Sequence, residues 1–198
     1  MSSFGCSISR AGLTSINGWK DLAGSISQGT NAAALTYEAY RGTPLKLYYF
    51  RHNQTDELHF VYQMQHDWIV GTAVRPHMHV IPMAAPILPQ VVSITGKYAW
   101  SQPGVAIPAD IGWQSYNALL TVNPGDVYKE ALIVLPQITP PLNLSSSMIL
   151  MIYVARSSTD VADTYITAKD HGTPTANLAL LSADIHYQAI SVGTVSEF

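Results

Sequence analysis

Short segments in which apolar and polar residues alternate recur along this chain, and they constrain its fold more than any other feature. In residues 58–65 the series Leu58, Phe60, Tyr62 and Met64 alternates with a more polar one. Because successive side chains of a strand point to opposite faces, this alternation is typical of a strand with one buried face. The sequence therefore predicts β structure here.

Further segments have the same character and are separated by Pro, Gly, Asn or Ser. The additional predicted strands are residues 45–49, 73–81, 91–100, 118–122, 128–135, 148–156 and 178–187. Residues 148–156 are continuously apolar, which is typical of a central strand covered on both faces. Residues 53–57, NQTDE, predict a hairpin loop between the first two strands.

Prolines mark the long connections between these strands. Pro82, Pro86 and Pro89 follow one predicted strand, and Pro136 and Pro140 follow another. Proline has no N–H to donate to a central ladder, so such segments connect strands across the fold. The pattern favours an all-β, Greek-key, jelly-roll-like sandwich of about eight strands over a parallel α/β sheet.

The first forty residues have a different character from the rest. They are rich in Ser, Gly, Ala and Thr, and Trp19 and Leu22 are their main apolar anchors. Residues 31–40 predict a short helix capped by Asn31 and ended by Gly42. We therefore expect an extended N-terminal arm over residues 1–40, ordered on a neighbouring subunit, and a sandwich domain over residues 41–198.

The composition indicates a chain that associates with other subunits. Hydrophobic residues make up 47% of the chain and charged residues 12%, against about 25% charged in ordinary domains. Protein interfaces are depleted of Lys and Glu in the same way, although a neutral polar surface is the alternative. We predict a homo-oligomer, a dimer or trimer, with interface residues Trp19, Leu22, Trp100 and Trp113.

Several partners and compartments are disfavoured. The net charge is -3 and the Lys and Arg residues are scattered, so no basic field predicts direct nucleic-acid binding. Cys6 is the only cysteine, which excludes an internal disulfide framework and favours a reducing compartment. No apolar run is long enough to predict a membrane span, and no secretion signal is visible.

His77 and His79 form the most metal-like pattern in the chain. They lie two apart on a predicted strand and share a face, and His186 is a third candidate. Three imidazoles could hold a transition metal. The metal-binding cupins have a glutamate after the second histidine, where this chain has Met83 and Ala84. The alternative is that the histidines make ordinary hydrogen bonds or ring contacts inside the sandwich.

Catalytic signatures are missing elsewhere. The chain contains no GxSxG elbow, P-loop, GxGxxG or HExxH motif, so we expect no enzyme activity and no cofactor. Asp160, Asp163 and Asp170 follow a predicted strand and suggest a cation-binding loop, for which a solvated loop is the alternative. Seven aromatic residues suggest a carbohydrate platform, although strands and interfaces use such residues as well. They are Tyr48, Tyr49, Phe50, Trp68, Tyr98, Trp100 and Trp113.

The chain resembles virion structural proteins of tailed bacteriophages in the run HFVYQMQHDWIVGTAVRPHMHVIP: a His-Asp-aromatic step, a later glycine, and a Pro-His-x-His strand. The resemblance continues in MILMIYVARSSTDVADTY, where an Arg precedes an Asp-rich loop, and ends in LLSADIHYQ. Together these elements span residues 19–188. Family members usually carry an aromatic residue after the second histidine, where this chain has Val80.

The resemblance implies a jelly-roll-like particle protein and no catalytic residues. It leads us to expect a capsid cement or decoration protein that contacts the major capsid protein, in a virion assembled in the host cytoplasm. A collar or tail adaptor, or a fibre-base protein that contacts neck or tail proteins, is the first alternative. A cupin-like enzyme that binds metal through His77, His79 and His186 is the second, and receptor or glycan binding through exposed aromatic residues is the third.

Overall fold

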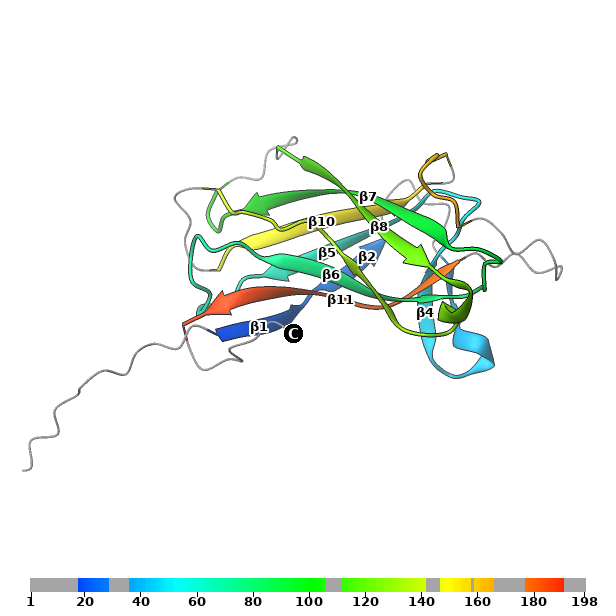
Figure 1. Ribbon diagram of the computed structural model, residues 1–198. Helices are drawn as coiled ribbons and strands as arrows, with labels where there is room; N and C mark the ends of the chain where they lie inside the picture. The colour runs from blue at the N-terminus through cyan, green and yellow to red at the C-terminus, as the bar shows by residue number, and fades with distance from the viewer. Residues whose placement is uncertain are drawn as a thin grey trace, which may run out of the picture.

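A computed structural model describes residues 18–28, 36–105, 112–141, 147–157, 159–165 and 177–190. The described chain forms two antiparallel sheets packed face to face (Figure 1). This confirms the predicted all-β, jelly-roll-like sandwich. The described residues contain eleven strands, so the sequence prediction missed three of them.

The six-stranded sheet carries most of the residues discussed below. Its members are β1 (Gly18–Ala23), β3 (Thr36–Ala39), β4 (Lys46–Phe50), β6 (Arg75–Pro82), β9 (Ala131–Val134) and β11 (Leu178–Ala189). The order is β3-β4-β11-β6-β9. Along the edge of β11 that faces away from β6, β4 pairs with the first residues of β11 and β1 pairs with its later residues. The pairing of β6 with β11 shifts between Leu180 and Ser182, which marks a bulge.

The five-stranded sheet has the order β2-β5-β10-β7-β8. Its members are β2 (Ser25–Gln28), β5 (Asp56–Gln63), β7 (Gln90–Ser101), β8 (Gln114–Val122) and β10 (Ile149–Arg156), and two short 3-10 turns, η1 (Tyr40–Gly42) and η2 (Pro124–Asp126), lie between strands. In β10, Leu150, Ile152 and Val154 are fully buried between the sheets. On the opposite face Ile149, Met151 and Tyr153 are only partly buried, so this central strand is not covered on both faces along its whole length as predicted.

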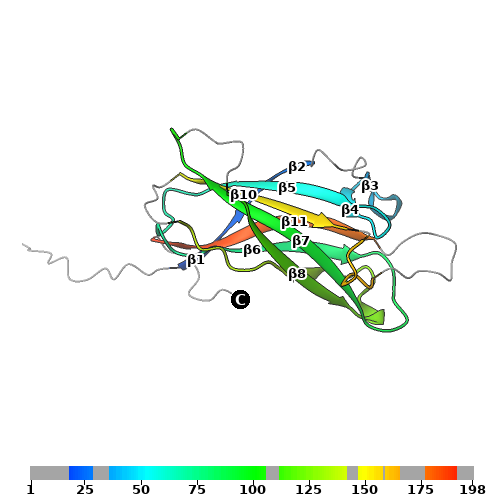
Figure 2. The same ribbon diagram turned by 90° about the horizontal axis from the view of Figure 1, so that it is seen from above.

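The N-terminal segment is built into the sandwich where the structure describes it. β1 pairs with β11, β2 with β5 and β3 with β4, and Figure 2 shows the chain passing from β1 to β2 between the sheets. Gly24 makes this passage possible, because a Cβ there would lie 2.6 Å from the ring of Tyr62. The described residues of the predicted arm are therefore edge strands of this subunit, while residues 1–17 lie outside the described ranges.

Two local predictions were wrong. The segment 53–57 is not a hairpin loop, because β4 and β5 belong to different sheets and the turn between them crosses the sandwich. The buried carboxylate of Asp56 accepts a hydrogen bond from the backbone N–H of Arg51 at 2.6 Å and fixes this crossing. The predicted helix over residues 31–40 is also absent at its described end, where Thr36–Ala39 forms β3.

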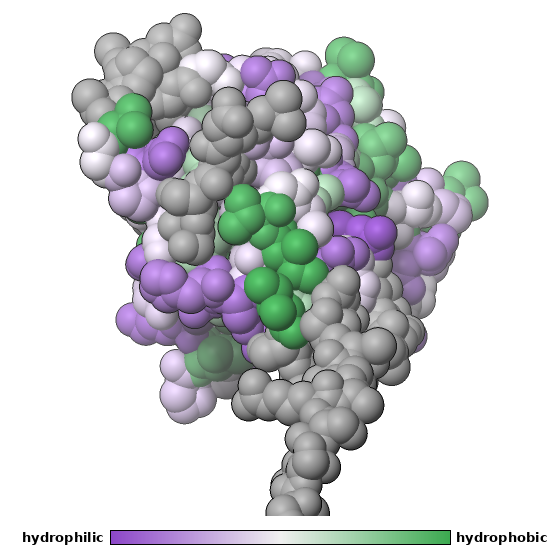
Figure 3. Space-filling model, turned by 90° about the vertical axis from the view of Figure 1, so that its left-hand side faces the viewer, coloured by the Kyte–Doolittle hydropathy of each residue, from purple (hydrophilic) through white to green (hydrophobic). Residues whose placement is uncertain are grey.

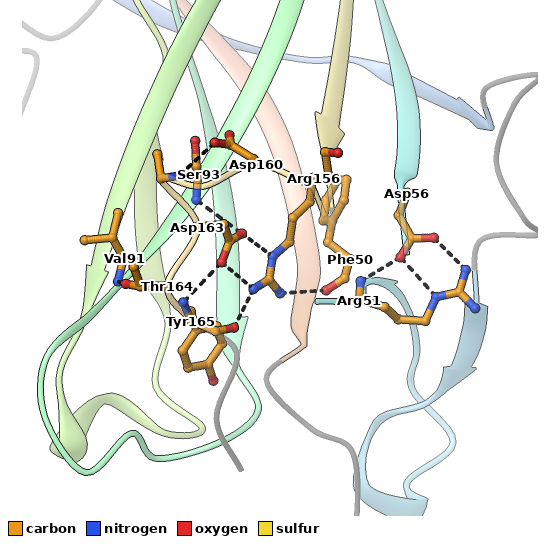
Figure 4. A network of polar contacts seen from close by, with 12 residues as sticks. Phe50, Arg51, Asp56, Val91, Ser93, Arg156, Asp160, Asp163, Thr164 and Tyr165 are labelled. Atoms are coloured by element: carbon orange, nitrogen blue, oxygen red, sulfur yellow. Dashed lines mark hydrogen bonds and ion pairs between the residues drawn. The ribbon is translucent and has the colours of Figure 1, made fainter. Parts of the chain in front are cut away.

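Arg156, the last residue of β10, is the centre of a buried polar network (Figure 4). Its guanidinium donates to both carboxylate oxygens of Asp163, at 2.7 and 2.9 Å. It also donates to the carbonyl oxygens of Phe50 and Tyr165, at 3.2 and 2.7 Å. These bonds hold the loop after β10 in contact with both sheets.

The Asp-rich loop, which the sequence suggested as a cation site, belongs to this network. The Asp163 carboxylate is saturated by Arg156 and by the backbone N–H of Tyr165, which lies 3.1 Å from it. Asp160 instead accepts a bond from the N–H of Ala162, and Asp170 lies outside the described residues. In the described part of the loop, the carboxylates therefore serve the fold. No helix in the described ranges has the length and hydrophobicity to cross a bilayer.

Candidate functional site

The outer face of the six-stranded sheet carries a cluster of histidines and carboxylates. Met78 and Val80 of β6 point into the core, so His77 and His79 point outward, as the alternation of the strand requires. On the neighbouring β11 the register places Asp184 opposite His77, and β6 and β11 lie side by side in Figure 1. This juxtaposition confirms that His77 and His79 share a face.

Asp184 is the common contact of these two histidines. Its Oδ1 lies 2.7 Å from Nε2 of His77 and 3.5 Å from Nε2 of His79. The ring centroids of His77 and His79 are 5.0 Å apart and steeply inclined to each other. Two imidazole nitrogens and one carboxylate oxygen therefore converge on one point of the sheet surface.

The charges in this cluster support one another. Burial acts to lower the pKa of His77, but the hydrogen bond and the charge of Asp184 outweigh it and raise that pKa above the ordinary value. Burial acts to raise the pKa of Asp184, yet the bond to His77 and the nearby histidines hold it below the usual value. Burial and the charge of His77 lower the pKa of His186. The pair His77–Asp184 thus carries the main charge interaction.

His186 faces a different carboxylate from the one that joins the other two histidines. Its ring centroid lies 4.4 Å from that of His77, yet its Nε2 lies 2.8 Å from Oδ1 of Asp21 on β1. The structure therefore brings the three predicted histidines together but adds Asp184, which the sequence reasoning missed. Asp184 stands two residues before His186, so period-two spacing on a strand could have signalled it.

A small cavity lies beside this cluster. Its volume is about 160 Å³, and Arg75, Pro76, His77, Val134, Leu135, Gln137 and His186 line it. At its border the guanidinium of Arg75 lies 4.7 Å from the ring centroid of Trp19, a cation–π contact across the sheet surface. The cavity has room for water or a small ligand next to His77.

A larger pocket lies near the end of β7. It has a volume of about 420 Å³, and its described lining residues are Tyr98, Ala99, Trp100, Gly112, Gln114, Thr139 and Pro141. Tyr98 and Trp100 lie two apart on β7, both partly buried and packed against the core, and Gln114 is paired with Tyr98 across the strands. Because Gln114 and Gly112 are exposed, the pocket opens to solvent at β8.

The aromatic wall of this pocket is fixed from behind. The indole ring of Trp100 stacks on that of buried Trp68, with centroids 5.8 Å apart and planes inclined by 9°. At the end of the sandwich where β7 and β11 finish, hydrophobic side chains gather between hydrophilic ones (Figure 3). Val70 and Ile190, close to the end of β11, are 44% and 57% exposed. A rigid aromatic surface therefore lies near an apolar rim.

The four predicted interface residues have contacts within their own chain. Trp19 lies under Arg75, and Leu22 and Trp100 pack against the hydrophobic core. Trp113 is partly buried next to β8. A role for these residues in subunit contacts stays a prediction.

No protein-family model matches the chain, and no curated protein matches it. Solved structures of carbohydrate-binding modules do match. One is a chain of Clostridium thermocellum xylanase 10B with CBM22-1 and GH10 modules, complexed with xylohexaose. The sequence identity is 13% and the TM-score is 0.37. The match covers 87% of this chain and 27% of that chain. This chain thus spans little more than a quarter of the xylanase chain.

Two further structures are single modules from the same organism. The C-terminal family 22 carbohydrate-binding module of xylanase 10B is 10% identical, with 92% of each chain covered and a TM-score of 0.36. The family 11 module, in complex with a β-1,3-1,4-mixed-linked tetrasaccharide, is 10% identical, with 93% of this chain and 92% of that chain covered and a TM-score of 0.36. At such identities and TM-scores, the likeness assigns no residue and no ligand to this chain.

These comparisons contradict the expected membership among tailed-phage virion proteins. The matching structures described above are carbohydrate-binding modules, and none of them is a virion protein. The predicted role as a capsid cement or decoration protein is therefore wrong, together with its collar, tail-adaptor, fibre-base and cupin-like alternatives. The predicted oligomeric state, location and lack of catalytic activity are not addressed and stay predictions.

The motifs that suggested a virion protein have structural roles in the sandwich. Asp67 of the His-Asp-aromatic step accepts a bond from the hydroxyl of Tyr187 and pairs with Lys20. The Arg before the Asp-rich loop is Arg156, which binds Asp163. Such contacts stabilise an antiparallel sandwich whatever its function, which is why these short motifs misled the functional prediction.

Proposed function

We propose that this protein is a non-enzymatic saccharide-binding module and that the pocket lined by Tyr98, Trp100 and Gln114 holds its ligand. The observation that carries the proposal is the combination of two aromatic rings with an exposed amide in an open pocket of about 420 Å³. Small-molecule sites in proteins have volumes of about 300–1,000 Å³ and combine apolar walls with a few polar groups.

The chemistry of the lining suits a neutral, amphipathic ligand. No described lining residue carries a formal charge. A sugar ring presents C–H groups on its faces and hydroxyl groups around its edge. Tyr98 and Trp100 offer flat apolar surface to such a face, and the amide of Gln114 and the hydroxyl of Thr139 can both donate and accept hydrogen bonds at its edge. The oligosaccharides bound by the similar structures fit this proposal, which rests on the pocket alone.

The same lining argues for binding rather than hydrolysis. Glycoside hydrolysis uses a pair of carboxyl groups that flank the scissile bond. The described lining contains no Asp, Glu, His or Lys. A saccharide held there would meet aromatic rings and neutral polar groups, without a carboxylate to protonate the leaving oxygen or to attack the ring.

Isothermal titration calorimetry against a panel of neutral oligosaccharides tests this proposal. We expect saturable binding to at least one member. Tyr98→Ala and Gln114→Ala should each weaken it about tenfold or more, a loss typical of a well-packed aromatic or hydrogen-bonding contact. Ser115→Ala is the matched control, because Ser115 is exposed and adjacent to Gln114 but points to the opposite side of β8.

Two results would overturn the proposal. Folded wild-type protein that binds no member of the panel contradicts it. So does binding that both pocket variants retain at full affinity. Tyr98 packs against the hydrophobic core, so thermal unfolding must show that Tyr98→Ala is folded before its affinity is compared. Trp100 also stacks on buried Trp68, so its removal would alter stability more.

A further inference from the structure

The His77–His79–Asp184 cluster has the arrangement of a metal site and lies apart from the proposed saccharide pocket. The three ligand atoms, one from each side chain, all lie within 4.8 Å of one another. The side chains of His77, His79 and Asp184 are 5%, 27% and 20% exposed. The point on which they converge is thus held by the sheet on one side and can be reached from solvent on the other.

The separations suit one small cation. Zinc lies about 2.0–2.2 Å from a histidine nitrogen or a carboxylate oxygen. Two ligands on one zinc ion are therefore separated by roughly 3 to 3.5 Å in a tetrahedral site. The Oδ1 of Asp184 lies 2.7 Å from one imidazole nitrogen and 3.5 Å from the other. Small side-chain rotations would bring all three atoms to bonding distance without any change in the strands.

The second nitrogen of a metal-bound histidine is usually held by an acceptor, which orients the ring. His79 has this arrangement, because its Nδ1 lies 2.5 Å from Oε1 of Glu130 and its Nε2 faces Asp184. His77 also has a hydrogen bond to the backbone of Arg75 in addition to its contact with Asp184. The ring of His79 is thus oriented from behind by Glu130, and the Nε2 atoms of both rings face the same carboxylate.

We infer that His77, His79 and Asp184 bind a divalent transition-metal ion of the zinc class. Two imidazole nitrogens with one carboxylate favour zinc and its first-row neighbours over calcium and magnesium, which prefer oxygen ligands. His186 is a neighbour and not a ligand, because its Nε2 faces Asp21. The side chains of His79 and Asp184 are 27% and 20% exposed, so water or a ligand atom from solvent can complete the coordination.

Metal titration of the full chain, freed of metal by a chelator, tests this inference. We expect calorimetry with Zn²⁺ to show one saturable site, and Co²⁺ to give the visible absorption bands of a low-coordinate complex. His79→Ala and Asp184→Asn should each reduce the Zn²⁺ affinity about a hundredfold, and Glu130→Gln about tenfold because it frees the ring of His79. Thermal unfolding followed by circular dichroism checks that each variant is folded.

Two control variants make the assignment specific. His66 is exposed and lies outside the cluster, so His66→Ala should leave the affinity unchanged. His186→Ala should change it only slightly. Folded wild-type protein that binds no Zn²⁺, or an affinity that His79→Ala leaves intact, overturns the site. A loss on His186→Ala as large as that on His79→Ala overturns the ligand set. Tyr98→Ala should retain full Zn²⁺ affinity, so the saccharide proposal and this inference fail separately.

Discussion

Arg156 and Asp163 form a bidentate ion pair that is almost closed to solvent. Arg156 is fully buried and the side chain of Asp163 is 5% exposed. The pair joins the end of β10 to the loop that follows it, and the same guanidinium reaches the carbonyl oxygen of Phe50 at the end of β4. One side chain thereby links the two sheets at this end of the sandwich.

Loss of Arg156 should destabilise the fold strongly. Arg156→Met removes the cation and leaves Asp163 buried without its charge partner, which typically costs about 3–5 kcal/mol. Urea unfolding followed by tryptophan fluorescence would measure this as a lower free energy of unfolding. Arg156→Met combined with Asp163→Leu should recover part of the loss, because it removes the buried charge as well. An Arg156→Met variant that is as stable as wild type would contradict this account.

Gly96 should tolerate no side chain. A Cβ at this position would lie 2.1 Å from the ring of Tyr116, whose hydroxyl passes over Gly96 to donate to the carbonyl of Tyr153. We expect Gly96→Ala to lower the free energy of unfolding by about 1–3 kcal/mol, as overpacking in a core does. Gly125→Ala is the matched control, since a Cβ there would meet no heavy atom within 4 Å. Equal stabilities of the two variants would contradict the predicted clash.

The protein should lose stability in alkali, because burial raises the pKa of several tyrosines above 10.0. For Tyr165 and Tyr187, where burial is the largest cause, the pKa rises to about 12. Their neutral forms are favoured in the folded state, so this stability is fully present below the unfolded pKa near about 10 and is lost as pH rises toward the folded value. Urea unfolding at about pH 9 and about pH 11 checks the direction. Stability that is equal or greater at the higher pH would be inconsistent with it.

Self-association is a prediction from composition that can be tested on named residues. Ile87 and Leu88, in the connection between β6 and β7, are 78% and 71% exposed. Adjacent exposed apolar residues favour a contact with another chain. We expect light scattering after size exclusion to give a dimer or trimer, and Ile87→Ser with Leu88→Ser to shift it toward monomer. A wild-type chain that is monomeric at high concentration would dispose of this prediction.

The sequence predicted the later strands well because apolar residues alternate with polar ones in several of them and form a continuous apolar run in residues 148–156. The predicted strands from residue 45 onward correspond to β4 through β11. The three earlier strands are edge strands that pair on one side only, and β1 and β2 together present few large apolar residues, such as Leu22 and Ile26. Their position depends on pairing with distant strands, which composition does not reveal.

The candidate sites were predictable only in part, because sheet register brings distant segments together. The spacing of His77 and His79 placed them correctly on one face. Which residue of β11 lies opposite them depends on the bulge between Leu180 and Ser182, so Asp184 rather than His186 is their shared contact. The pocket is formed by β7 and the segment after β9, and no local sequence pattern predicts that these two segments lie together.

A nuclear magnetic resonance titration with oligosaccharides tests the saccharide-binding proposal most directly, because it reports the binding position as well as the affinity. The account predicts saturable shifts of the indole N–H signal of Trp100 and the side-chain amide signal of Gln114. The signals of His77 and His79, on the other sheet, should stay in place. Spectra that no oligosaccharide changes, or shifts that leave Trp100 and Gln114 unaffected, would contradict it.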